Sequence, residues 1–116
     1  MTQLKEFMLI FSYQPTNEEP STEQLQQMQK EWGSFINGVA MQGKLVSTHR
    51  LGFEGTIIST NQTIENSIQI SEGKIVSGNM ILKAFSLNEA TEIARKCPIF
   101  SMGGNVEVRN TIPMEL

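Results

Sequence analysis

Residues 5–13 read KEFMLIFSY, and this stretch decides the fold. Successive side chains of a β-strand point to opposite faces, so the odd-numbered residues from Phe7 to Tyr13 would share one face, and Met8 and Ile10 the other. Both sets are largely apolar. A strand with two apolar faces must be buried on both, and we therefore expect a sheet that is covered on each side.

The segment after this strand has the periodicity of a helix. Ser21 and Gln24 form the pattern of a capping box, in which each side chain bonds the backbone N–H of the other residue, and they predict a helix over residues 21–42. Gly33 and Gly38 each cost about 1 kcal/mol relative to alanine in a helix, and we expect them to allow close packing against a sheet. The apolar stripe consists of Leu25, Met28, Trp32, Phe35, Ile36 and Val39.

A second helix is predicted later in the chain. Ser86 and Glu89 repeat the capping-box pattern, the helix should run to about Lys96, and Pro98 ends it. The long strand before it should bulge near Gly78, because a glycine inside a strand often marks a bulge. Strands are expected after the first one over residues 44–51, 55–60, 63–70, 75–85 and 105–112.

The order of these elements predicts an α+β fold. Each half reads strand, serine-capped helix, strand, which is typical of a ferredoxin-like split βαβ sheet with both helices on one face, and residues 1–116 are treated as a single domain. The other face would be left open, and monomers rarely expose an apolar face of that size. We expect a second copy to cover it around a two-fold axis. The alternative is that the middle segment, residues 52–71, folds over it.

The composition argues against two classes of binding partner and indicates a cellular location. The net charge is −3 and the basic residues are scattered, whereas surfaces for nucleic acid or anionic membranes need clustered lysine and arginine, so we expect neither partner. The single cysteine, Cys97, cannot form an internal disulfide and fits a reducing compartment. Glu6 interrupts any signal-type apolar run. The expected location is therefore the cytoplasm.

The absence of some residue types excludes mechanisms that need them. The sequence has no aspartate, one histidine and one cysteine, so a metal cage of histidine and cysteine is excluded and no cofactor is expected. Cys97 follows the inner face of the second predicted helix at its C-terminal end. That position raises the pKa of a thiol, so we do not expect Cys97 to be a nucleophile.

Six segments have the order and spacing of one known family: KEFMLIF (5–11), WGSF (32–35), QGKL (42–45), residues 87–98, GNVEVR (104–109) and IPM (112–114). On this set the chain resembles the YCII-related proteins of the DGPF type. The resemblance implies a dimeric α+β barrel, in which two ferredoxin-like sheets pack face to face with a cleft near the dimer interface. Members have mostly unknown biochemistry; some are encoded beside alternative sigma factors of RNA polymerase, and others resemble small-molecule enzymes or are fused to them.

The chain departs from that family at its signature. The Asp-Gly-Pro-Phe motif should fall near residues 66–69, which read NSIQ, and the Gly-Gly-Tyr that follows is reduced to Ser77-Gly78-Asn79. The His–Asp pair of the YCII branch has no counterpart, because the chain has no aspartate. The sequence therefore assigns no reaction.

His49 is the main candidate for a functional side chain. Histidine is the one residue type whose ordinary pKa lies near neutrality, and His49 stands at the end of a predicted strand. It would act as a base or as a ligand contact in the interface cleft, oriented by a carboxylate such as Glu54 or Glu72. The alternative is a surface or interface histidine without such a role.

Four further residues complete the candidate site. The planar guanidinium of Arg50 suits a carboxylate or phosphate. The phenol of Tyr13 would reach a cleft at the end of its strand, unless it is a hydrogen-bonded structural tyrosine. Ser77 and Asn79 lie on the strand that replaces the family motif. We expect these side chains to bind a small molecule near the dimer interface.

Two classes of function follow. The first is a protein that binds a small molecule, or a weak enzyme, with its cleft around His49. The second is a non-catalytic interaction or regulatory module that acts by protein contact, for example in transcription regulation. A deep polar cleft containing His49 favours the first class, whereas a filled cleft and an exposed apolar patch elsewhere favour the second.

Overall fold

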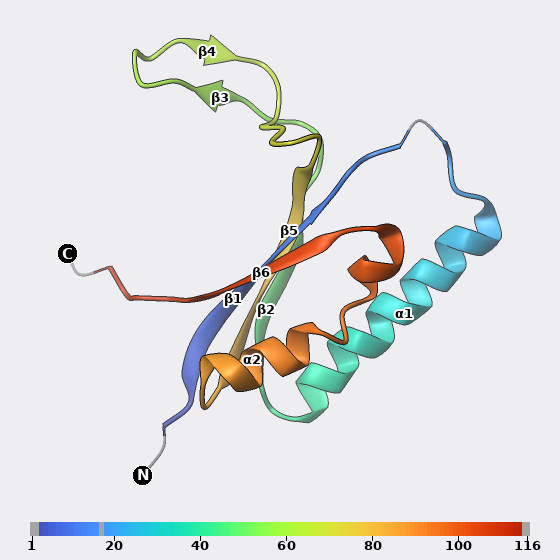
Figure 1. The fold of residues 1–116 in the computed structure, drawn as a ribbon, viewed down its shortest axis with the longest axis vertical. Helices are drawn as coiled ribbons and strands as arrows, with labels where there is room; N and C mark the ends of the chain where they lie inside the picture. The colour runs from blue at the N-terminus through green and yellow to red at the C-terminus, as the bar shows by residue number, and fades with distance from the viewer. Residues whose placement is uncertain (1–2, 17, 115–116) are drawn as a thin grey trace.

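The structure is a computed structural model that describes residues 3–16 and 18–114. Its elements follow the order expected for an α+β fold, with a short hairpin and a helical turn in addition (Figure 1). In chain order they are β1 (Lys5–Tyr13), α1 (Thr22–Met41), β2 (Leu45–Arg50), β3 (Ile57–Ile58), β4 (Ile64–Glu65), β5 (Ile75–Ala84), α2 (Leu87–Ala94), the 3-10 helix η1 (Pro98–Met102) and β6 (Asn105–Asn110).

Four strands form one sheet in the order β2-β5-β1-β6, and all neighbouring pairs are antiparallel. The two long strands, β1 and β5, occupy the centre. Both α1 and α2 lie on the same face of this sheet, and no other described element covers the second face (Figure 1). This architecture is compatible with the ferredoxin-like fold expected from the element order, and β1 has the predicted bounds.

The core lies between the sheet and the two helices. On β1, Phe7, Leu9 and Phe11 are buried, whereas Met8 and Ile10 on the other face are half-buried. Full burial of such a side chain stabilises the fold by about 1.5–3 kcal/mol. The odd-numbered face of β1 is therefore the face on which the helices pack. The other elements add Phe35, Val39, Met80, Leu82, Ala84, Ala90, Ile93, Ala94, Cys97 and Ile99.

Trp32 holds α1 against the sheet. Its ring lies edge-on to Phe11 of β1 and to Phe35 of its own helix, with ring-centroid distances of 5.2 and 6.1 Å. Edge-to-face contacts of this kind stabilise the fold by about 0.5–1.5 kcal/mol beyond the contribution of the buried apolar area. The tryptophan therefore belongs to the apolar stripe that the sequence predicts, packed on the central strand.

The serine caps begin both helices, but only the first forms a complete box. Ser21 Oγ accepts from the Gln24 N–H at 3.1 Å, and Gln24 Oε1 accepts from the Ser21 N–H at 2.8 Å. Ser86 Oγ likewise accepts from the Glu89 N–H at 3.1 Å. The Glu89 carboxylate does not accept a hydrogen bond from the Ser86 N–H, because it pairs with Lys44 Nζ at 2.8 Å. The second predicted capping box is therefore half-formed.

The predicted bulge in the long strand is confirmed. Phe11 of β1 pairs with Gly78, and Ser12 pairs with Val76, so Ser77 is the extra residue. A Cβ at Gly78 would lie 2.4 Å from the carbonyl oxygen of His49, closer than any real contact. Glycine is needed here because the backbone of β2 passes directly over it.

The middle segment, residues 52–71, forms a hairpin that stands away from the sheet, and we call it the arm. Its strands β3 and β4 pair through two residues each, far fewer than predicted for residues 55–60 and 63–70. In Figure 1 the arm extends past the ends of β2 and β5 and does not lie over the sheet. The alternative in which this segment covers the second face is therefore wrong.

Candidate functional site

Two residues of the predicted site meet on the sheet face that the helices leave uncovered, which we call the open face. His49 of β2 lies opposite Asn79 of β5, and His49 Nδ1 is 3.2 Å from Asn79 Oδ1. Directly opposed residues of an antiparallel pair share a face. Asn79 is also opposite Ile10, which points away from the core. On the side of Asn79 away from His49, the pair adjoins half-buried apolar side chains of β1 and β5, namely Met8, Ile10 and Ile81.

The amide of Asn79 orients the His49 ring. An amide oxygen only accepts hydrogen bonds, so in this orientation the hydrogen lies on Nδ1, and Nε2 of the neutral ring is an acceptor for another molecule. Neither Glu54 nor Glu72 forms an ion pair with His49 in the described part of the chain. The expected carboxylate partner is therefore replaced by an amide, which holds the ring without adding charge.

The other three predicted residues do not join this pair. Tyr13 packs against the core on the helix side of the sheet. Arg50 follows His49 directly in β2, so its side chain points to the opposite face. Ser77 lies in the bulge, where its Oγ donates to the carbonyl oxygen of Phe11 at 3.3 Å. The sequence contained a signal for part of this separation, because adjacent strand residues cannot share a face.

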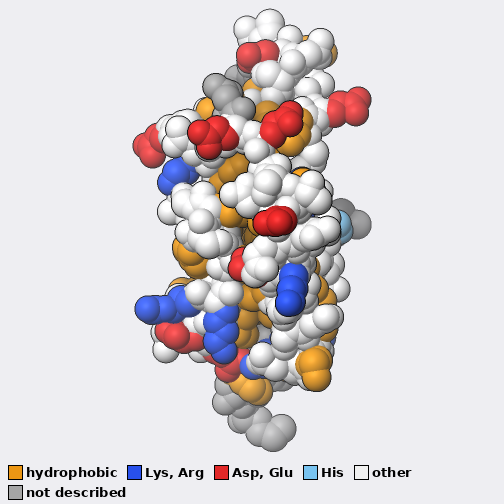
Figure 2. Space-filling view, turned by 90° about the vertical axis from the view of Figure 1, so that its right-hand side faces the viewer, with side chains coloured by type: hydrophobic (Ala, Val, Ile, Leu, Met, Phe, Trp, Pro, Cys, Tyr) orange, Lys and Arg blue, Asp and Glu red, His pale blue; other side chains and the backbone are white. Residues whose placement is uncertain are grey.

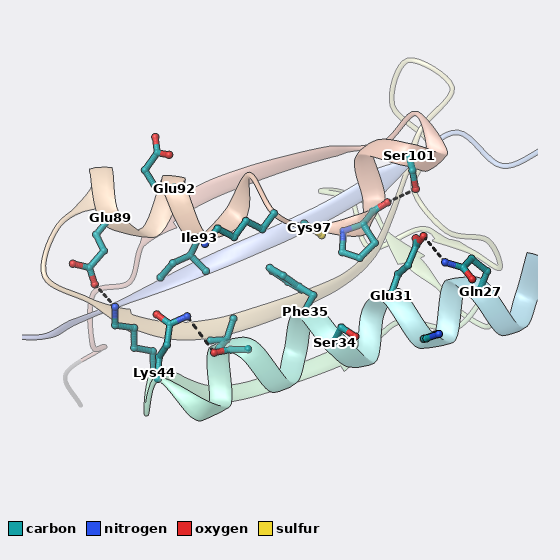
Figure 3. Close-up of a pocket in the computed structure, with 16 residues that line it drawn as sticks. Gln27, Glu31, Ser34, Phe35, Lys44, Glu89, Glu92, Ile93, Cys97 and Ser101 are labelled. Atoms are coloured by element: carbon teal, nitrogen blue, oxygen red, sulfur yellow. Dashed lines mark hydrogen bonds and ion pairs between the residues drawn. The ribbon is translucent and has the colours of Figure 1, made fainter.

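A groove between α1 and the α2–η1 segment was missed by the sequence analysis. Its volume is about 850 Å³, and Figure 3 shows its side chains converging from the two helical segments. At one end Lys44 pairs with Glu89, and toward the other end Gln27 Nε2 donates to Glu31 Oε1 at 3.0 Å. The apolar floor is formed by Phe35, Val39, Ile93 and Cys97.

The two glycines of α1, Gly33 and Gly38, do not pack closely against another element. A Cβ added at Gly33 or at Gly38 would meet no atom within 4 Å. The predicted close packing of these glycines on the sheet is therefore wrong. Gly38 lines the groove instead, where its missing side chain widens the gap between the helices.

Cys97 is enclosed at the floor of the groove. Burial raises the pKa of its thiol from 9.0 to about 11, and a hydrogen bond with the backbone of Ile99 opposes this shift in part. A thiol with so high a pKa is protonated at neutral pH and is a poor nucleophile. The expectation that Cys97 is no nucleophile agrees with this, with burial as the main cause.

A second, smaller hollow of about 530 Å³ lies along β6. Its lining includes Glu107 and Arg109 on the strand and Leu87 at the start of α2. None of the five predicted residues lines either the groove or this hollow. On a single chain, His49 is exposed on the open face, and Asn79 beside it is half-buried.

Two further observations concern membranes and metals. No helix in the described ranges has the length and apolar character of a membrane span. Within residues 3–16 and 18–114, no three side chains of the types His, Cys or Glu converge as they would around a metal ion.

The comparisons with known proteins identify no relative. The sequence matches no protein-family model, and it matches no curated protein. The resemblance to the YCII-related proteins therefore stays a prediction, and the function must be argued from the side chains described above.

Proposed function

We propose that the protein is a homodimer of the YCII-related, dimeric α+β barrel type that binds a small polar molecule between two open faces. The observation that carries this proposal is the hydrogen-bonded pair of His49 and Asn79, 3.2 Å apart on a sheet face that is otherwise apolar at its centre. The binding site is completed only when a second copy covers that face.

The apolar centre of the open face supports the dimer. Met8, Ile10 and Ile81 are neighbours across β1 and β5, and only neighbouring side chains shield them from water. Burying side chains of this size is worth about 1.5–3 kcal/mol each, which favours a partner for the whole face. The arm does not supply the cover, so the cover comes from another chain.

The chemistry of the pair supports a small polar ligand. His49 offers Nε2 as an acceptor, and the amide nitrogen of Asn79 is a donor, so together they suit a molecule that has both a hydroxyl or amino group and a carbonyl or carboxylate. In an interface with an apolar centre, such polar contacts would fix the orientation of the ligand. No chemical step is proposed, because the hydrogen-bond partner that the described side chains give the ring is an amide, Asn79.

A second function has an observation of its own. The arm and the groove between the helices both expose apolar surface on a single chain. Such surfaces suit a non-catalytic interaction or regulatory module that acts by protein contact, for example in transcription regulation. In that case, His49 would be an interface residue without a ligand.

Thermal unfolding against a panel of metabolites tests the proposal, with light scattering to measure the molar mass. A ligand at about 100 times its dissociation constant adds roughly 2.7 kcal/mol, which raises the midpoint by several degrees. We expect a mass twice the 13.0 kDa of one chain, and at least one ligand whose shift is lost in His49→Ala and in Asn79→Ala. Lys96→Ala, in the groove, is the matched control and should keep the shift.

The outcomes separate the two functions. A shift that is lost in Lys96→Ala but kept in His49→Ala would move the binding site to the groove. A dimer that responds to no metabolite would favour the interaction module. A monomer at micromolar concentration would contradict the proposed site, because the open face would then have no cover.

A further inference from the structure

The arm has an apolar surface that its own chain does not use. Phe53, Ile58, Ile64 and Ile70 are exposed by 64, 64, 67 and 61%. A hairpin with two residue pairs is marginal by itself, so an arm this exposed needs a surface to pack on. In the proposed homodimer, on which this inference rests, the second copy supplies that surface.

The opposite end of the open face has exposed apolar side chains as well. Leu4 and Phe85 are 46 and 43% exposed. Leu4 directly precedes β1 and Phe85 directly follows β5, so both lie at the same end of the sheet. Glu6 and Lys83 are themselves directly opposed in β1 and β5. We call Leu4, Lys83 and Phe85 the far end, because the arm leaves the sheet at its other end (Figure 1).

Charge differs between the arm and the far end. The chain from Leu51 to Gly73 contains Glu54, Glu65 and Glu72 and no lysine or arginine. The far end carries the exposed Lys83, which is directly opposite the exposed Glu6, so this end has a cation that the arm lacks. Figure 2 shows the side of the molecule that carries α1, where acidic side chains are frequent toward the upper end and both acidic and basic side chains lie in the lower half.

The two-fold axis decides where an arm lies on the second copy. When two copies of one face pack together, the axis lies in the plane between them, and its two limiting directions are along the strands and across them. An axis along the strands brings both acidic arms to one end of the dimer. An axis across the strands brings each arm to the far end of the second copy.

The pairing of the strands favours the axis across them. Arg109 is opposite Met8, and Glu107 is opposite Ile10, so the two charges occupy successive rows of the open face. A two-fold axis that runs across the strands between these two rows places each row of one copy over the other row of the second copy. Arg109 then lies over Glu107 of the second copy. It also separates the arms, whose carboxylates would repel each other at one end. The two rows are Ser47–Ile81–Met8–Arg109 and His49–Asn79–Ile10–Glu107.

We propose that the arm of each copy packs on the far end of the other copy's open face, with its isoleucines against Leu4 and Phe85 and its carboxylates beside Lys83. The arm then closes one end of the interface in which the His49 pair lies. The same axis places Ser47 of the second copy over His49, so the second copy contributes a hydroxyl to the ligand site.

Cross-linking in solution tests the arrangement. We would place cysteines at Ile64 and Phe85 of the 116-residue chain and add a short bis-maleimide. The arm precedes β5 and Phe85 follows it, and the ten residues of this strand span about 33 Å, so a short bis-maleimide does not join these positions within one chain. We expect a covalent dimer on a denaturing gel. The wild type is the blank, because Cys97 is buried.

Two matched variants make the result specific. Ile64→Cys alone should give little covalent dimer, because the two arms lie at opposite ends of the complex. Ile64→Cys with Leu25→Cys, whose second site is 46% exposed on α1, should also give little. Efficient cross-linking of Ile64→Cys alone would show that the arms meet each other, and it would overturn the proposed axis.

A charge variant supplies an independent measurement. Ile58→Lys and Ile64→Lys together change only exposed arm side chains, so the chain should fold, and we expect dimerisation to weaken by about tenfold or more in sedimentation. If the protein is a dimer whose affinity these changes leave intact, and no Ile64–Phe85 cross-link forms, the arm contact is refuted while the homodimer stands. A monomeric wild type would refute both.

Discussion

Lys44 Nζ and Glu89 Oε1 lie 2.8 Å apart and join the residue before β2 to the first turn of α2. Their side chains are only 21 and 30% exposed, and Glu89 Oε1 is enclosed with no hydrogen-bond partner beyond this ion pair. The pair closes one end of the groove between the helices. It also explains why the carboxylate of Glu89 does not complete the capping box of α2.

Lys44→Met should destabilise the protein by about 1–2 kcal/mol, because it leaves an enclosed carboxylate oxygen without its cation. The figure is lower than for a fully buried pair, since water still reaches both side chains. Urea unfolding measures the change, and a double-mutant cycle with Glu89→Gln isolates the pair. Glu92→Gln is the control, because its partner Arg95 is 3.6 Å away and both side chains are mostly exposed. Equal losses in Lys44→Met and Glu92→Gln would contradict the assignment.

Two glycine-to-alanine changes should have opposite effects. Gly78→Ala places a Cβ 2.4 Å from the carbonyl oxygen of His49, which must push β2 outward, and we expect a loss of about 1–3 kcal/mol. Gly38→Ala meets no atom within 4 Å on a helix and should stabilise the protein by up to about 1 kcal/mol. Thermal and urea unfolding of the two variants measure both signs. A tolerated Gly78→Ala would mean that β2 does not pass over this glycine.

Much of the fold could be predicted because alternation and helical periodicity report burial directly. β1 has the predicted bounds, and the capping box at Ser21 and the bulge beside Gly78 lie where local sequence chemistry indicates. The length of the arm strands could not be predicted. Isoleucines such as Ile58 and Ile64 have strand propensity anywhere, but a long strand also needs a sheet to join, and the two arm strands pair only with each other.

The candidate site was predicted less well for a different physical reason. The sequence places His49 and Asn79 on two strands, but only the register of those strands brings the two side chains opposite each other. Tyr13 was assigned to the same cleft by its position at a strand end, although its parity places it with the core. The groove depends on how far apart α1 and α2 lie, and no local pattern encodes that separation.

Cys97 should react slowly with thiol reagents until the protein unfolds. The raised pKa keeps the thiol protonated, so the rate of modification should rise with pH up to about 11 and stay far below that of an unfolded chain. The folded pKa exceeds the unfolded value, so this group should leave stability unchanged below pH 9.0 and lower it progressively as the pH rises toward about 11. Rates with a chromogenic disulfide, with and without urea, test the first part. Fast modification of the native protein at neutral pH would contradict the burial.

Ile81 and Leu82 are adjacent on β5 and should report the two faces of the sheet separately. Leu82 is fully buried under the helices, so Leu82→Ala should cost about 2–5 kcal/mol at any protein concentration. Ile81 points to the open face, so Ile81→Glu should leave each chain folded and prevent dimerisation. Sedimentation measures the assembly, and unfolding at protein concentrations about tenfold apart shows whether stability depends on it. If Ile81→Glu remains a dimer with unchanged affinity, the interface lies elsewhere, and the pair of His49 and Asn79 loses the cover on which its proposed ligand depends.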